Sequence, residues 1–109
     1  MERIIGKQLS SVEFVQDYVQ LRFDGVCLTA YVWPTVVCSS TTLALSHAGY
    51  RDALCGNIGR IVKAAHVEEG KRIQIEFEGG TMMMISLRPQ DYQGPEAAEL
   101  QDGDNRVVF

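Results

Sequence analysis

The chain has 109 residues, of which 46% are hydrophobic and 22% are charged, and its formal net charge is −4. A chain of this length forms one small domain that can bury its own core. The acidic balance and the scattered lysines and arginines argue against a nucleic-acid partner, because phosphate contacts need a basic face. The N-terminus lacks the layout of a signal peptide and no stretch is apolar enough to span a membrane, so we expect a cytoplasmic protein.

One pattern of strand and turn residues occurs twice. Both copies begin with Ile-Gly-basic and contain an apolar-Gln-apolar-charged-Phe-acid-Gly segment, followed by an apolar run that ends in proline. The copies span 5–34 and 58–89, with a connector at 35–57 and a tail at 90–109. A recurring segment predicts a recurring structural unit, so we expect two related halves in a single domain.

The first copy is predicted to form a three-stranded antiparallel meander. A first strand is expected within 4–14, and residues 19–24 alternate apolar and polar side chains, which is the period of a half-buried strand. Asp24-Gly25 is a hairpin turn signal. The return strand, 26–33, is apolar on both faces, which favours cover by a helix, by the other copy or by a partner chain. Pro34 ends this strand because it cannot donate a ladder hydrogen bond.

The connector is predicted to contain a helix. Serines and threonines at 39–42 offer N-caps, and apolar residues at three- and four-residue spacing over 43–54 indicate a helical stripe. Gly49 weakens such a helix by about 1 kcal/mol relative to alanine. We therefore expect a helix in one or two pieces, ending at Gly56-Asn57.

The second copy and the tail complete the chain. Strands are predicted at 58–67, 72–78 and 81–87, and residues 79–80 form the second hairpin turn. Residues 96–100 have helix propensity, but the turn residues at 102–105 indicate a hairpin that pairs 97–101 with 106–109. We favour the hairpin.

Together these elements predict a mainly β fold of the α+β kind. It consists of two three-stranded antiparallel meanders in an internal pseudo-twofold repeat, a helical connector and a C-terminal hairpin, arranged as a bent sheet or a small open barrel. Exposed strand edges are a liability that chains resolve by pairing with another copy, so we expect a homodimer.

The Ile-Gly-basic starts, the Phe-acid-Gly hairpins and the Asp-Tyr-Gln-Gly-Pro-Glu segment at 91–96, followed by Asp-Gly, resemble small uncharacterised bacterial proteins. These are short proteins carried on mobile gene cassettes or encoded beside toxin genes as immunity proteins. The resemblance implies a compact β-rich fold and an accessory role. It transfers no catalytic residue to any position of this chain.

No residue pattern indicates catalysis or metal binding. The cysteines, Cys27, Cys38 and Cys55, have no CxxC spacing, and the histidines, His47 and His66, have no HxH, HxxxH or HxxE spacing. No glycine-flanked nucleophile supports a Cys–His pair. The sequence therefore predicts no cofactor, no metal and no catalytic residues, while an enzyme that uses His66 or Cys38 stays open.

Aromatic and methionine side chains are the best candidates for a binding surface. Tyr31 and Trp33 correspond to Ser86 and Arg88 in the second copy, and two aromatics on one strand face suit a ligand wall or a dimer anchor. The methionine run offers an adaptable surface. Core packing is the competing interpretation of both features. The candidate residues are Tyr31, Trp33, Tyr50, Arg51, His66, Met82 and Met84.

Three functions follow from these observations. The first is a non-catalytic protein-binding module of a bacterial accessory protein, of which an immunity-type protein facing a basic toxin is one version. The alternative is a protein that binds a small apolar ligand in a pocket near Trp33. The third is an enzyme with a histidine- or cysteine-based site beside a carboxylate.

Overall fold

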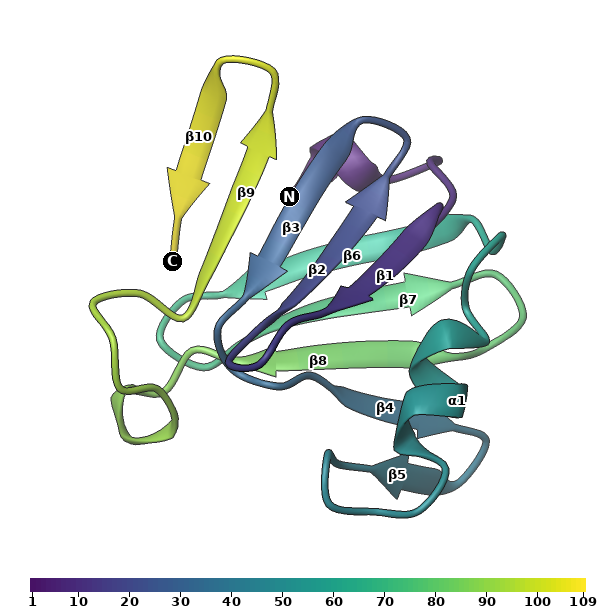
Figure 1. The fold of residues 1–109 in the computed structure, drawn as a ribbon. Coiled ribbons are helices and arrows are strands. Elements are labelled where there is room, and N and C mark those ends of the chain that lie inside the picture. The colour runs from purple at the N-terminus through teal and green to yellow at the C-terminus, as the bar shows by residue number, and fades with distance from the viewer.

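The computed structural model describes residues 1–109 and consists mainly of β-strands (Figure 1). The first half contains the 3-10 helix η1 (Glu2–Ile4), β1 (Ser11–Phe14), β2 (Val19–Phe23), β3 (Val26–Ala30), β4 (Thr35–Cys38) and β5 (Thr41–Leu43). The second half contains the helix α1 (Tyr50–Cys55), β6 (Val62–Glu68), β7 (Arg72–Phe77), β8 (Met82–Ser86), the 3-10 helix η2 (Pro89–Asp91), β9 (Ala98–Asp102) and β10 (Asn105–Val108).

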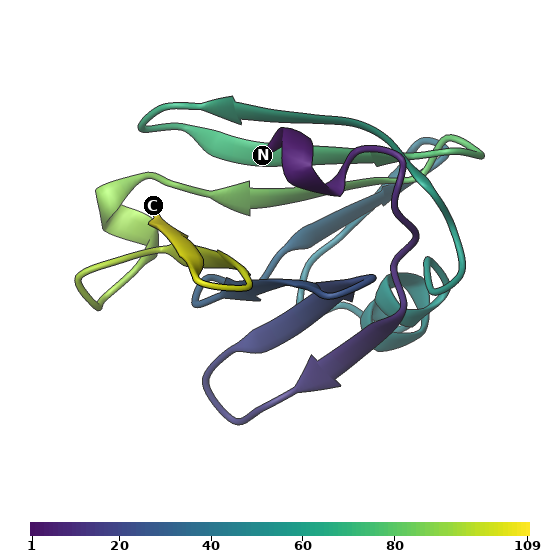
Figure 2. The ribbon, with the colours of Figure 1, turned by 90° about the horizontal axis from the view of Figure 1, so that it is seen from above.

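The strands form two antiparallel sheets of five strands each. The first sheet has the order β1-β2-β3-β9-β10 and the second has the order β5-β4-β8-β7-β6. Seen from above, the two sheets lie as two layers (Figure 2). The predicted mainly β antiparallel fold is confirmed, and the sheets do not close into a barrel because no strand of one sheet pairs with a strand of the other.

The last hairpin of each half belongs to the sheet of the other half. β4 leaves the first sheet and pairs with β8, where Val36 lies opposite Met83, while β9 leaves the second sheet and pairs with β3, where Leu28 lies opposite Leu100. The two sheets therefore have equivalent strand orders: β1, β2 and β3 of the first sheet correspond to β6, β7 and β8 of the second, and the hairpin β9-β10 corresponds to the hairpin β4-β5. The predicted meanders and the C-terminal hairpin are confirmed, but the repeat pattern does not predict this exchange of hairpins.

Hydrogen bonds between the two halves show the same two-fold pattern. The N–H of Gly6 donates to the carbonyl of Val62 at 2.9 Å, and the N–H of Gly59 donates to the carbonyl of Leu9 at 2.7 Å. Leu9 follows Gly6 at the same spacing as Val62 follows Gly59. The first half is therefore the donor in one bond and the acceptor in the equivalent bond. Both glycines have positive φ, 84° and 92°, a conformation that glycine adopts readily.

The hydrophobic core lies between the sheets. Buried hydrophobic residues form a single cluster of 22 side chains, and inward residues alternate with outward ones along the central strands. Leu21 and Leu28 enter the core from the first sheet, and Ile75 and Met83 enter it from the second. Full burial of a side chain of this size contributes about 1.5–3 kcal/mol, which explains why the period-2 segments predict these strands well.

The helix in the connector is shorter than the predicted stripe. Residues 41–43 form β5, and α1 begins only at Tyr50, directly after Gly49, whose φ of 82° is left-handed and therefore non-helical. Tyr50 and Leu54 are buried, and α1 contacts β1 and β4. Of the helix predicted in one or two pieces over 43–54, only the piece after Gly49 forms, and it covers one edge of the two layers.

Several strands are also shorter than predicted. Residues 4–14 contain the end of η1 and the short β1. Within 58–67, β6 begins only at Val62, and a single bridge joins Ile61 to Gln8. The return strand predicted over 26–33 ends at Ala30, because the chain then turns toward the other sheet. None of the helices has the length and hydropathy needed to cross a membrane.

Candidate functional site

The larger of two clefts lies where the chain crosses between the sheets. Its volume is about 1200 Å³. Its floor is the outward face of the second sheet, where Thr35, Met84 and Ser86 alternate with buried residues of β4 and β8. Its walls are the crossover at 31–33, which follows β3, and the segment at 88–96, which precedes β9. We call it the Trp33 cleft.

Three of the seven candidate residues line the Trp33 cleft. They are Tyr31, Trp33 and Met84. The crossover that carries the two aromatics is fixed to the opposite wall, because the N–H of Tyr31 donates to the carbonyl of Ala97 at 2.9 Å. The presence of aromatic residues at positions 31 and 33, where the second copy has serine and arginine, is therefore the sequence feature that indicates this cleft.

Trp33 is held by an aromatic neighbour. The ring centroids of Phe14 and Trp33 are 6.2 Å apart, and their planes differ by 19°. The guanidinium of Arg51, from α1, lies over Phe14 at 5.6 Å from the ring centroid. Aromatic pairs contribute about 0.5–1.5 kcal/mol, so Phe14 limits the motion of the indole. Arg51 therefore acts on the cleft through Phe14 and does not line it.

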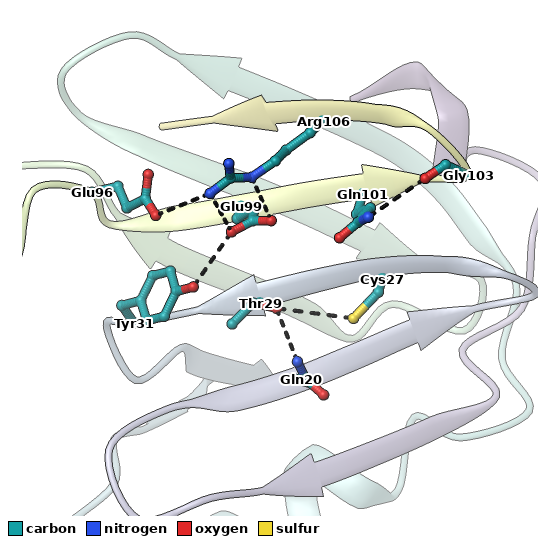
Figure 3. Close-up of polar contacts among 9 residues, drawn as sticks. All are labelled: Gln20, Cys27, Thr29, Tyr31, Glu96, Glu99, Gln101, Gly103 and Arg106. Carbon is teal, nitrogen blue, oxygen red and sulfur yellow. Dashed lines mark hydrogen bonds and ion pairs between the residues drawn. The ribbon is translucent and has the colours of Figure 1, made fainter.

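Tyr31 joins the cleft to a polar network on the outward face of the first sheet (Figure 3). Its hydroxyl donates to Glu99 Oε2 at 3.5 Å, and its ring centroid lies 5.8 Å from that of Tyr18. Glu99 also accepts two hydrogen bonds from Arg106, at 2.8 and 3.2 Å. Burial, followed by the negative charges of Glu99 and Glu96, raises the pKa of Tyr31, so its phenol is a proton donor at neutral pH.

The outward face of β3 is covered by this network and not by another layer of the chain. Gln20 Nε2 donates to Thr29 Oγ1 at 3.3 Å, and Cys27 Sγ lies 3.9 Å from the same hydroxyl (Figure 3). The expected cover by a helix or by the other copy is therefore absent, because neighbouring polar side chains cover Thr29.

Tyr50 lies in the core, away from the cleft. It is 1% exposed, and its hydroxyl donates to the carbonyl of Pro34. Burial raises its pKa to about 12. Tyr50 therefore fixes the start of β4 from the core side, and β4 carries part of the floor of the cleft.

Met82 and His66 lie on the outward face of the second sheet but do not reach the cleft. Met82 on β8 stands opposite Val37 and Glu76. His66 on β6 stands opposite Gln74 on β7. Met84 lies one strand period from Met82 and does line the cleft. The structure thus separates two methionines that share one strand and one face.

The basic residues of the cleft all come from the second sheet, whereas its acidic residues come from both sides. Asp17, in the turn between β1 and β2, and Glu96, just before β9, belong to the first sheet. The basic lining residues, Lys71, Arg72 and Arg88, lie at the ends of β7 and β8 in the second sheet, and the acidic Asp91 follows β8 in η2. No sequence pattern signals this grouping, because charged turn residues are common on any solvated surface.

The basic side is partly neutralised. Lys71 Nζ and Arg72 Nη2 lie 3.3 and 3.4 Å from the Glu68 carboxylate, and the hydrogen bond from Lys71 is the main cause of the lowered pKa of Glu68. Arg88 has no carboxylate within ion-pair distance. Asp91 accepts a hydrogen bond from Ser86 Oγ.

A smaller cleft of about 350 Å³ opens between β6 and the C-terminal hairpin. Its lining is mainly apolar and includes Val67, Leu87, Val108 and Phe109. Tyr92 lines both clefts, so the segment at 88–96 separates them.

The structure contains no group of three histidine, cysteine or acidic side chains that could hold a metal ion. The three cysteines are free and half-buried. His47 Nδ1 accepts a hydrogen bond from the N–H of Ala44 at 2.9 Å, which makes it a turn residue.

Comparison with known proteins gives no match to any protein-family model, curated protein or solved structure. The resemblance to small cassette-borne and immunity-type bacterial proteins therefore stays a prediction.

Proposed function

We propose that the protein is a non-catalytic binding module that holds a segment of a partner protein in the Trp33 cleft. The observation that carries this proposal is the placement of the single tryptophan, stacked on Phe14 at the wall of an open cleft of about 1200 Å³. Tryptophan and tyrosine are the residues most often responsible for binding energy at protein interfaces.

The lining favours a peptide segment over a small apolar ligand. Only 7 of the 20 lining residues are hydrophobic, and the others include both acidic and basic side chains. Small-molecule sites are mostly apolar, enclose about 300–1000 Å³ and bury most of the ligand. An open cleft with mixed chemistry suits a chain segment whose side chains are themselves mixed.

The arrangement required by the enzyme hypothesis has no support in the geometry. A general base or nucleophile needs a carboxylate or a second catalytic group within hydrogen-bond reach. His66 is exposed on β6, and the His47 ring accepts its one hydrogen bond from the backbone N–H of Ala44. The binding function is therefore the better proposal.

A peptide selection tests the proposed function. A phage-displayed library of random 12-residue peptides is selected on the protein and depleted on the Trp33→Ala variant. Selected peptides are then titrated while the fluorescence of Trp33 is followed. We expect Met84→Ala to weaken binding and Met82→Ala to leave it unchanged, because only Met84 lines the cleft. Peptides that bind Trp33→Ala equally well, or a selection that yields none, would refute the proposal.

We also propose that two copies associate through β10. All four residues of this edge strand are exposed, and Val107 and Val108 expose 44% and 51% of their surface. An apolar strand edge with unpaired backbone groups is a template for a further strand. A second copy that adds its own β10 antiparallel would join the two first sheets into one. Light scattering on the purified protein should therefore give the mass of two chains.

A further inference from the structure

We infer that the Trp33 cleft recognises a basic side chain, a lysine or an arginine, of the segment that it binds. The inference rests on the proposed function and names the chemistry of its partner. The site is the first-sheet side of the cleft, formed by Tyr31, Trp33, Asp17 and Glu96, all of which line it.

The aromatic part of this site is fixed in place before anything binds. Trp33 stacks on Phe14 at 6.2 Å, and Tyr31 packs against Tyr18 at 5.8 Å and donates a hydrogen bond to Glu99. A cation within about 6 Å of an aromatic ring is attracted by the negative face of that ring. Rings that are already ordered lose little entropy when a ligand arrives.

The carboxylate of Glu96 is available to a ligand. Its side chain is 25% exposed and lies 3.9 Å from Arg106, without a hydrogen bond. Arg106 instead donates both of its short hydrogen bonds to Glu99 (Figure 3). Glu99 thus neutralises Arg106, and Glu96 keeps its acceptor capacity for an arriving ammonium or guanidinium.

Asp17 supplies a second free carboxylate. It is exposed in the turn between β1 and β2 and has no ion pair within the chain. Two carboxylates with free acceptor capacity beside two aromatic rings match the charge and the apolar stem of lysine or arginine, both of which bury their methylenes against apolar surface.

The second-sheet side of the cleft is less favourable for the same side chain, because three of its four charged lining residues are basic. Arg88 has no ion-pair partner there, and Lys71 and Arg72 share one carboxylate, Glu68. Asp91 is the one acidic residue there, and it already accepts a hydrogen bond from Ser86 Oγ, so a basic residue placed on that side would meet mainly like charge, which is unfavourable. The bound residue is therefore directed to Glu96 and Asp17.

Two small probes test the inference directly. N-acetyl-arginine amide and its neutral analogue N-acetyl-citrulline amide are titrated into the protein while Trp33 fluorescence and amide NMR shifts are recorded. We expect the arginine probe to bind with an affinity about fivefold higher than the citrulline probe and to shift the signals of Tyr31 and Trp33. Equal binding of the two probes, or shifts elsewhere, would overturn the inference.

Matched variants separate local recognition from overall charge. Glu96→Gln and Asp17→Asn should each remove most of the preference for arginine over citrulline. Glu78→Gln changes the net charge equally, but Glu78 lies in the turn after β7 and does not line the cleft, so the preference should persist. Loss of the preference in Glu78→Gln as well would reduce the effect to long-range electrostatics and overturn the inference.

The peptide selection distinguishes this inference from the proposed function. Selected peptides that depend on Trp33, contain arginine or lysine, and bind less tightly after replacement by citrulline support both. Peptides that depend on Trp33 but contain no basic residue support the proposed function and overturn the inference. An empty selection refutes the proposed function, and the arginine probe still decides whether the site takes a cation.

Discussion

Trp33 and Phe14 stack at 6.2 Å, although one follows β3 and the other ends β1, at the edge of the same sheet. The contact reaches past β2 and fixes the crossover at the point where the chain leaves the first sheet. The residue with the strongest binding potential is therefore also part of the structure that forms the cleft.

Removing the ring of Phe14 should loosen Trp33. We expect Phe14→Ala to reduce the free energy of unfolding by about 1–3 kcal/mol, from the lost burial and stacking of a half-buried ring. Acrylamide should quench Trp33 more strongly in this variant. Arg51→Ala removes only the exposed cation above Phe14 and should cost at most about 1 kcal/mol. Equal quenching in wild type and Phe14→Ala would show that the stack does not restrain the indole.

The hydroxyl of Tyr50 should stabilise the start of β4. Tyr50→Phe removes the donor to the carbonyl of Pro34 and leaves that buried group unpaired, at a cost of about 1–3 kcal/mol measured by urea unfolding. Leu54 lies on the same helix, and Leu54→Met, which keeps the volume, should cost less than about 1.5 kcal/mol. A neutral Tyr50→Phe would contradict a role for the hydrogen bond.

Tyr50 should also make stability depend on pH in the alkaline range. Its pKa is about 12 in the folded protein against 10.0 for a free tyrosine, because burial disfavours the phenolate. A raised folded pKa stabilises the fold below pH 10, and this contribution is lost as the pH rises from 10 toward 12. Urea unfolding of wild type should weaken over this interval by up to about 1.4 kcal/mol per pH unit more than that of Tyr50→Phe. Parallel curves for the two proteins would contradict the assignment.

The two glycines that begin the halves should be sensitive to a β-carbon. Gly59 has a φ of 92°, and a β-carbon placed on it would have no heavy atom within 4 Å, so Gly59→Ala should cost about 1–2 kcal/mol through backbone strain alone. Gly6→Ala should cost a similar amount, because Gly6 has the equivalent position and a φ of 84°. Gly94 has equal space without a positive φ, and Gly94→Ala should be neutral or slightly stabilising in thermal unfolding.

The edge of β10 should control association. Phe109 and Ala98 exchange backbone hydrogen bonds, so alternate residues of β10 pair with β9, and the N–H of Val108 points to the open edge. Val108→Pro should therefore dissociate the proposed dimer in light scattering without breaking the pairing with β9. Val108→Thr keeps the N–H and should remain dimeric, as should Trp33→Ala. A single-chain mass for wild type would refute the dimer.

The strands with one buried face could be predicted from the sequence. Residues 19–24 and 72–78 alternate because one side of each strand meets the core, and their hairpins follow from Asp-Gly and Gly-Gly turns. The C-terminal hairpin was predictable from its turn residues. The start of the connector helix was not, because α1 begins only after the left-handed backbone of Gly49, whereas the apolar spacing already starts at residue 43.

The exchange of hairpins could not be predicted from local pattern. Pro34 signals only the end of a strand, whereas the partner of β4 is decided by contacts with β8, far along the chain. The cleft depends on this exchange, since both of its walls are crossovers. Trp33, Tyr31 and Met84 could be found because they differ between the copies or form an unusual run, but the grouping of Asp17 with Glu96 exists only in three dimensions.

The exchange of hairpins has a consequence for how the protein is made. The first sheet is completed by β9 and β10, which are made after every strand of the second sheet, and the second sheet is completed by β4 and β5 from the first half. The first sheet therefore cannot reach its final hydrogen bonding during synthesis of its own half, whereas the second sheet has all of its strands once β8 is made. The pairing of β9 with β3 should be a late step with a high loop-closure cost. A chain truncated before β9 should therefore leave the β3 edge of the first sheet unpaired, although it keeps every strand of the second sheet.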